Sequence, residues 1–374
     1  MCYSNYEKSK FLSYIIYHKC NGALAAAKEY KRAPIAIATE ITNLLKKHPD
    51  FKEVSCAMPG FINITLEDHF IIRYIDTMIV ANKFGCEEIG DNKTIIVDYG
   101  GPNVAKPLHV GHLRTAIIGE SIKHIGKFLG YKMLGDVHLG DWGLQIGLII
   151  AELKRRSPDL IYFDESYKGE YPMEAPFNMT ELEEIYPTAS SYAKSNPDFM
   201  EEAKQSTFLF QNGHRGYIAL WQHILNVSIE DLKKNYANLN VYFDLWKKES
   251  DAQPYIPKML EYLKNNGFAY LSDGALVVDV KDVSDTKDVP PCILVKSDGA
   301  TLYSTTDLAT IIERMELYNP DEIIYIVDKR QELHFEQVFR CAKKANLVPP
   351  NTKLTFLGFG TMNGKDGKNF MRLS

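Results

Sequence analysis

Several features that define other protein classes are absent from this 374-residue sequence. No stretch approaches the roughly 18 uncharged apolar residues that a membrane-spanning helix needs, so we predict no contact with a membrane. The charged residues Glu7, Lys8 and Lys10 interrupt the N-terminus before an apolar signal region can form. The six cysteines include no C-x-x-C pair, which argues against a disulfide framework or a zinc site. We therefore expect a cytoplasmic protein with reduced thiols.

An excess of positive charge is also missing. The formal net charge is −5, which argues against a protein that coats itself in nucleic acid. Any contact with nucleic acid would have to use local basic patches. A patch of this kind is more often just the solvated face of a helix. The candidates are Lys46-Lys47, Lys154-Arg155-Arg156, Lys233-Lys234 and Lys343-Lys344.

The chain is long enough for two or three domains. We predict that residues 1–88 form one of them, a small α+β domain. Three segments have helical patterns and two alternate like the strands of a hairpin around Met58-Pro59-Gly60. The helical segments are 23–30, 34–47 and 69–81, and the strands are 51–57 and 61–66.

Residues 89–374 alternate between strand-like and helix-like runs. This rhythm predicts an α/β domain of the doubly wound, Rossmann-like kind, with a parallel sheet covered by helices on both faces. A stretch from about 151 to 253 is rich in Tyr and Pro and then helical, and we interpret it as an insertion into that fold. The candidate strands are 94–99, 132–134, 275–280, 292–296 and 322–327.

The most informative segment is residues 100–114, which contain the tetrad His109-Val110-Gly111-His112. The tetrad lies between a buried strand and a helix, where free N–H groups and the helix dipole favour phosphate. The two imidazoles would face the same side, and Gly111 would let a flat base approach the backbone. Lys106 is close enough in sequence to reach a phosphate. We predict an ATP site here, although a tetrad alone is equally well explained by two histidines that cap a core helix.

The longer stretch from Pro102 to Arg114 closely resembles the signature of arginyl-tRNA synthetases, a class I aminoacyl-tRNA synthetase family. The resemblance implies that His109 contacts the phosphates of ATP and that His112 helps to order the nucleotide. It also assigns Asn103 to both ATP and arginine binding, with Gly111 on the ATP side. The segments Cys20–Ala23 and Pro59–Asn63 resemble the family's additional N-terminal domain, which contacts tRNA. The alternative is a domain that only packs on its neighbour.

Residues 138–147 resemble the family's G-D-W-G-x-Q segment beside the amino-acid pocket. The resemblance places His138 on the arginine side. Val137 stands where many family members have Asn, so we expect Asp136 to supply that polar contact instead. Trp142 fits a flat pocket wall or simple core packing equally well.

Residues 297–309 resemble the family segment whose Tyr and Asp recognise arginine. A guanidinium is planar and always charged, and a carboxylate that accepts two parallel hydrogen bonds matches it best. Tyr303 and Asp307 are therefore assigned to arginine, although Asp307 would also suit the N-terminus of a helix. Gln331, in a segment resembling the family's Q-x-L-H, is a further candidate.

Residues 360–370 resemble the start of the family's mobile lysine-rich loop, with Lys365 and Lys368 as catalytic candidates that neutralise the leaving pyrophosphate. After Phe370 the sequence departs from the family pattern, because Met371-Arg372-Leu373 replaces the expected lysine. We therefore expect impaired activation. The helical domain that reads the anticodon stem in the family is not part of this sequence, so we expect an incomplete or truncated form.

Together these segments predict an enzyme that activates L-arginine with ATP and Mg²⁺ and joins it to tRNA(Arg), releasing AMP and pyrophosphate. No metal site built only from protein ligands is expected, because magnesium usually keeps water and phosphate ligands. We expect a monomer. Two alternatives remain: a small-molecule nucleotidyltransferase, which shares the H-x-G-H site, and an inactive tRNA-binding or regulatory paralogue.

Overall fold

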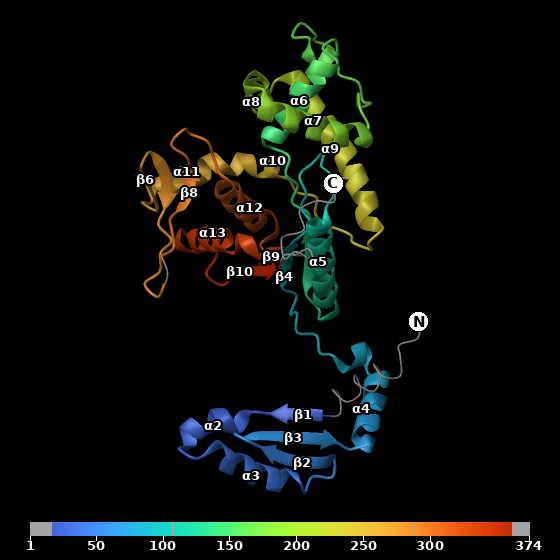
Figure 1. Cartoon of the computed structure of the whole chain (residues 1–374), viewed down its shortest axis with the longest axis vertical. Helices are drawn as coiled ribbons and strands as arrows, with labels where there is room; N and C mark the ends of the chain where they lie inside the picture. The colour runs from blue at the N-terminus through green and yellow to red at the C-terminus, as the bar shows by residue number, and fades with distance from the viewer. Residues whose placement is uncertain (1–16, 107, 287, 361–374) are drawn as a thin grey trace. The chain divides into compact units, whose positions relative to one another are not determined.

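The computed structural model describes residues 17–360 except 107 and 287. The chain divides into two compact units between Glu87 and Glu88. Figure 1 traces the elements of both units, from the blue N-terminal strands to the red C-terminal ones. Every helix among the described residues is too short or too polar to span a bilayer.

The N-terminal unit is a small α+β fold around one antiparallel sheet in the order β1-β3-β2. Helices α2 and α3 pack on the sheet and bury Ala23, Ala38, Val54 and Ile62 in a common core. The predicted helices and hairpin are confirmed, whereas the short edge strand β1 was not predicted. The elements are β1 (Tyr17–Cys20), α2 (Gly22–Tyr30), α3 (Pro34–Leu45), β2 (Phe51–Ala57), β3 (Phe61–Leu66) and α4 (Asp68–Val80).

The second unit is built on a four-stranded parallel sheet in the order β10-β9-β4-β5. Its central strands are buried on both sides and rich in Ile and Val, as the helix-covered strands of a parallel sheet should be. This confirms the predicted α/β class. The strands are β4 (Thr94–Asp98), β5 (Lys132–Asp136), β9 (Glu322–Asp328) and β10 (Lys353–Phe359), with α5 (Val110–Phe128) after β4 and α13 (Glu332–Lys344) after β9.

The order of the strands creates a switch point between β4 and β9. From β4 the chain moves through α5 to β5 on one side, and from β9 it moves through α13 to β10 on the other. In open α/β sheets, ligands bind outside the carboxyl ends of the strands at such a point. The segments that follow β4 and β9 therefore define the candidate site.

The prediction that segments 275–280 and 292–296 belong to the parallel sheet is wrong. They form a separate antiparallel sheet in the order β6-β7-β8. Asp273 and Gly274 both have positive φ and close a two-residue hairpin, which forces antiparallel pairing. The strands are β6 (Ala269–Ser272), β7 (Ala275–Val278) and β8 (Cys292–Val295), followed by α12 (Tyr303–Tyr318).

Between β5 and the antiparallel sheet lies a group of helices, which corresponds to the predicted insertion. Figure 1 shows α6, α7 and α8 gathered at one end of this unit, away from α12 and α13. Gly147 lets α6 approach α8 closely, because a Cβ there would lie 2.2 Å from the carbonyl oxygen of Ala203. The helices are α6 (Leu144–Arg156), α7 (Met179–Ser195), α8 (Pro197–Gln211) and α9 (Arg215–Ala237), followed by α10 (Glu249–Ala252) and α11 (Ile256–Asn265).

Candidate active site

The two histidines of the tetrad form the start of α5, as the sequence predicts. Their ring centroids lie 3.7 Å apart in a stacked arrangement. His109 Nδ1 accepts a hydrogen bond from the Gly111 amide at 3.1 Å, and His112 Nδ1 accepts one from the His109 amide at 3.4 Å. Because both Nδ1 atoms are acceptors, each ring carries its proton on Nε2 and presents a donor there.

Burial, His109 and Lys106 together lower the pKa of His112 to about 3. His112 is therefore a neutral hydrogen-bond donor near pH 7. Gly111 faces the ring of His109, since a Cβ at Gly111 would lie 2.8 Å from His109 Cε1. The missing side chain at Gly111 thus makes room for the histidine ring itself.

The loops that follow β4 and β5 are joined along their backbones. Val104 donates to the carbonyl of Gly140 at 3.0 Å, and Gly140 donates to that of Pro102 at 3.1 Å. Asn103 and Gly140 form the resulting parallel bridge, in which Asn103 stays exposed. This connection links the segment before the tetrad to the segment that contains His138.

Asp307 lies in the second turn of α12, where its carboxylate meets His334 of α13. Its Oδ2 lies 2.5 Å from His334 Nε2, and both side chains are partly exposed. Tyr303, one turn earlier, is 75% exposed. Asp307 therefore has a histidine as its partner. The alternative explanation, in which this carboxylate only caps a helix, is not needed.

Glu249 of α10 is a neighbour of this group that the sequence did not reveal. Burial raises the pKa of its carboxyl group, with His138 and Asp307 close enough to influence it through their charges. The hydroxyl of Tyr303 is partly shielded although the residue as a whole is exposed, and this shielding, Glu249 and Asp307 in turn raise its pKa. Glu249 lies at the end of the insertion and belongs to no recognisable motif, so only the fold brings it to this place.

An aromatic residue of the insertion links Lys106, near His112, to the acidic group, by which we mean Asp307, Glu249 and Tyr303. The Lys106 ammonium lies 4.6 Å from the ring centroid of Tyr186, a residue of α7. Tyr186 also influences Tyr303 electrostatically. Lys106 therefore lies between His112 and the acidic group.

Asp136 lies deeper than we expected. Its side chain is fully buried, and its Oδ2 pairs with Arg314 of α12 at 2.6 Å. Asp98 pairs with the same guanidinium at 2.6 Å. The assignment of Asp136 to arginine stays a prediction, but the structure already gives this carboxylate a guanidinium partner.

In the segment 138–147, the contacts of Trp142 and Asp141 are those of packing and of structural hydrogen bonds. Trp142 meets Phe210 and Trp221 edge to face, with ring centroids 4.5 and 5.7 Å away, which supports its packing role. Asp141 is fully buried and accepts hydrogen bonds from the amide and the hydroxyl of Ser250.

The remaining predicted residues are placed as follows. Gln331 is exposed, directly before α13 and one turn before His334. Lys365 and Lys368 lie outside the described residues. Within the described part of the chain, no group of three or more His, Cys, Asp or Glu side chains is arranged to hold a metal ion.

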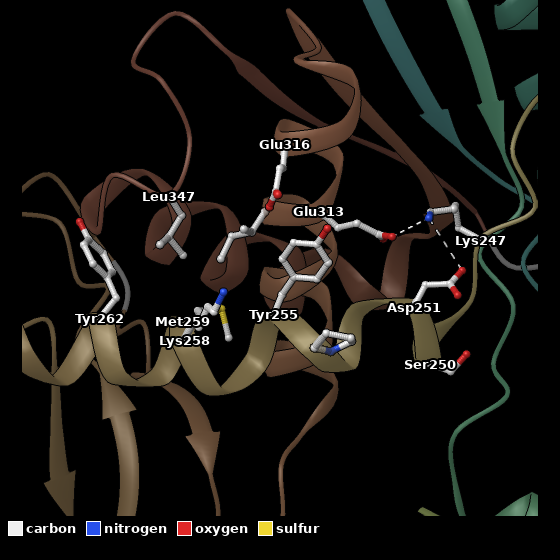
Figure 2. A pocket seen from close by; sticks show the side chains of 12 residues that line it. Lys247, Ser250, Asp251, Tyr255, Lys258, Met259, Tyr262, Glu313, Glu316 and Leu347 are labelled. Atoms are coloured by element: carbon white, nitrogen blue, oxygen red, sulfur yellow. Dashed lines mark ion pairs between the residues drawn. The ribbon is translucent and has the colours of Figure 1, made fainter. Parts of the chain in front are cut away.

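A hollow of about 740 Å³ lies beside the candidate site, not in it. Figure 2 shows its walls, with Tyr255 and Lys258 on one side and Glu313 and Glu316 of α12 on the other. Lys247 closes one end through ion pairs to Glu313 and Asp251. Since none of the predicted site residues lines this hollow, the chemistry is assigned to the edge of the sheet.

A strand–turn–helix histidine site at the switch point of a parallel sheet is the arrangement expected of a class I tRNA synthetase. In agreement, the catalytic domain described as "tRNA synthetases class I (R)" matches residues 75–373. The domain described as "Arginyl tRNA synthetase N terminal domain" matches residues 18–66. The chain belongs to the arginyl-tRNA synthetase family.

The chain is 62% identical over 352 residues to an arginine–tRNA ligase of Alkaliphilus oremlandii and 60% identical over 353 residues to one of Agathobacter rectalis. These matches cover 94% of this chain but only 60% and 59% of the relatives. The chain thus spans about three fifths of the length of these curated relatives.

Among solved structures, the chain resembles the arginyl-tRNA synthetase of Plasmodium falciparum, with a TM-score of 0.71 and 26% identity. That match covers 92% of this chain and 58% of the other. The arginyl-tRNA synthetase of Thermus thermophilus, at a TM-score of 0.66 and 20% identity, shares the fold over 93% of this chain and 60% of its own length.

Proposed function

We propose that this chain carries the catalytic part of an arginine–tRNA ligase, which activates L-arginine with ATP and transfers it to tRNA(Arg). The observation that supports this most directly is the group of Asp307, Glu249 and Tyr303, which Tyr186 and Lys106 link to the histidines at the start of α5. Two carboxylates and a phenol suit a guanidinium, and a helix N-terminus suits phosphate.

ATP would bind with its phosphates at the start of α5. His109 and His112 would donate hydrogen bonds from Nε2, and the helix N-terminus would add its dipole. Fixed hydrogen-bond donors suit this role because they stabilise negative charge that develops on the α-phosphate. Asn103 and Gly111 would line the nucleotide, and magnesium would accompany the phosphates, which supply most of its ligands together with water.

Arginine would lie with its guanidinium toward Asp307, Glu249 and Tyr303. The further candidates Asn103, His138 and Gln331 would bind polar groups of the same ligand. The arginine carboxylate would then attack the α-phosphate, forming arginyl-adenylate and releasing pyrophosphate. The catalysis consists of positioning and electrostatics and requires no covalent enzyme intermediate. Lys365 and Lys368 would neutralise the pyrophosphate.

Transfer of the arginyl group to tRNA completes the proposed reaction, with the N-terminal unit as one tRNA contact. Three of the four basic patches are engaged in surface ion pairs or a backbone hydrogen bond, which already give part of their charge a partner within the chain. Lys46-Lys47 at the end of α3 is the remaining candidate for tRNA. We place the protein in the cytoplasm as a monomer.

Arginine-dependent exchange of pyrophosphate into ATP, measured with and without tRNA(Arg), tests this function. Exchange that requires arginine supports it. Exchange with another acceptor in place of arginine would instead show a nucleotidyltransferase. Tight tRNA binding without exchange would show the inactive paralogue that the altered segment after Phe370 suggests.

A further inference from the structure

His334 and Asp307 form a short contact at the centre of the acidic group. The 2.5 Å between His334 Nε2 and Asp307 Oδ2 joins the start of α13 to the start of α12. The side chains are 31% and 25% exposed, so the pair is shielded but still within reach of a ligand.

Without a ligand, this arrangement gives Asp307 a cationic partner of its own. The hydrogen bond with Asp307 is the main cause that raises the pKa of His334, and burial opposes it only in part. A guanidinium that binds Asp307 would bring a second positive charge close to the imidazolium. Two cations beside one carboxylate repel each other, and histidine is the one that can discharge near pH 7.

We infer that His334 is a positioning residue for arginine: it holds the Asp307 carboxylate in the empty site as a stand-in cation and loses one proton when the guanidinium arrives. This inference rests on the proposed function of the site. The charges balance, because imidazolium and free arginine become neutral imidazole, bound arginine and one proton released to solvent. Neutral His334 can keep its hydrogen on Nε2 and still donate to Asp307.

Several other titratable groups face this pair. Cys292 of β8 influences His334 directly, and its thiol is hydrogen-bonded to Cys341 of α13. Asp307 and His138 both lie close enough to Glu249 of α10 to influence its carboxyl group through their charges. Glu249 is the other group that could release a proton on binding arginine, because burial raises the pKa of its carboxyl group. His334→Gln keeps Glu249, so a difference in proton release between the parent and this variant reports His334.

The decisive experiment is titration calorimetry of the chain with L-arginine near pH 7, in buffers that differ in ionisation enthalpy. The dependence of the measured heat on the buffer gives the number of protons released. We expect release by the parent chain and almost none by His334→Gln, whose amide still donates to Asp307 but carries no charge. We also expect the affinity of the parent to rise with pH, by at most about tenfold per pH unit, and that of His334→Gln to change little.

His124→Gln is the matched control. His124 on α5 also pairs with a carboxylate, with 3.0 Å between its Nε2 and Glu120 Oε1, but it lies outside the acidic group. This variant should release as many protons as the parent. If the parent binds arginine without releasing protons, or if His334→Gln releases the same number, the inference is wrong. A parent that does not bind arginine at all would refute the proposed function as well.

A direct measurement covers the case in which His334→Gln fails to fold. NMR titration of the imidazole of His334 in the parent should show a lower pKa with saturating arginine than without it. An unchanged pKa would overturn the inference independently of any variant.

Discussion

Asp141 accepts two hydrogen bonds from Ser250, one from the amide at 2.9 Å and one from the hydroxyl at 2.7 Å. This carboxylate of the G-D-W-G segment is fully buried, so it does not itself face a ligand. It instead fixes α10, whose first residue is Glu249. The contact explains how the loop after β5 can control the acidic wall of the proposed arginine site.

Replacing Asp141 with Ala should weaken arginine binding by about tenfold or more, because hydrogen bonds to a charged group contribute about 1.5–3 kcal/mol. ATP binding should stay close to that of the parent, because the start of α5 is unaffected. Calorimetry with each substrate measures both. Equal losses for ATP and arginine would mean that Asp141 supports the whole domain and not α10.

Asp307→Asn should lower arginine affinity strongly. Removing one partner of a shielded charge pair typically costs about 3–5 kcal/mol, a factor of a hundred or more. Glu249→Gln should act in the same direction, whereas citrulline, whose ureido side chain is neutral, should bind poorly to the parent. An Asp307→Asn variant that binds arginine like the parent would remove Asp307 from the site.

His109→Ala should slow arginine-dependent pyrophosphate exchange by about 10²-fold, if its Nε2 donor stabilises charge on the α-phosphate. His109→Gln supplies an amide donor and should recover part of the loss. The comparison uses initial exchange rates at saturating arginine. Equal rates for all three proteins would exclude His109 from the reaction.

His112 should make the folded chain less stable at acidic pH than at neutral pH. Its pKa in the folded chain is about 3, below the ordinary value of 6.5. Between these values the unfolded chain binds more protons, so stability is lost as the pH falls below about 6.5. Between about pH 6.5 and 5, the free energy of unfolding of His112→Gln should fall by up to about 2 kcal/mol less than that of the parent, as measured by urea denaturation. Parallel pH profiles for parent and variant would contradict the shift.

Arg314→Met should destabilise the second unit by about 3–5 kcal/mol, because Asp98 and Asp136 would lose their shared partner. Arg330→Met is the matched control, since Arg330 forms an exposed pair with Asp328. Its loss should cost less than about 1 kcal/mol. The denaturation midpoints of the two variants, each compared with the parent, measure this difference. Similar losses of stability in both variants would show that burial of the Arg314 pair contributes nothing.

The sequence predicted the elements whose local pattern and neighbours agree. The Ile- and Val-rich run of β4 followed by the histidine tetrad fixed both the strand and the start of α5. The hairpin of β2 and β3 was predicted from its alternation and turn residues. In these cases every signal lies within a few residues of the element.

The features that the sequence did not reveal concern partners that only the folded chain selects. The apolar patterns of β7 and β8 reveal strands but not which sheet they join, whereas the Asp273-Gly274 turn between β6 and β7 selects antiparallel pairing. Asp136 suited a ligand by its position, yet Arg314 reaches it from 178 residues further along the chain. Glu249 and His334 were not assigned roles because their significance comes from Asp307, which lies far away in sequence.

The pairing of β4 also has a consequence for how the protein is made. Ile95 of β4 pairs with Glu322 of β9, more than 200 residues later. At about 5–20 residues per second, a ribosome needs roughly 10–45 s to synthesise the stretch between them. During that interval one edge of a strongly apolar strand has no hydrogen-bonding partner, and such edges attract other chains. The helices of the insertion are completed within this interval. The second unit is therefore most exposed to aggregation after those helices have formed and before β9 emerges.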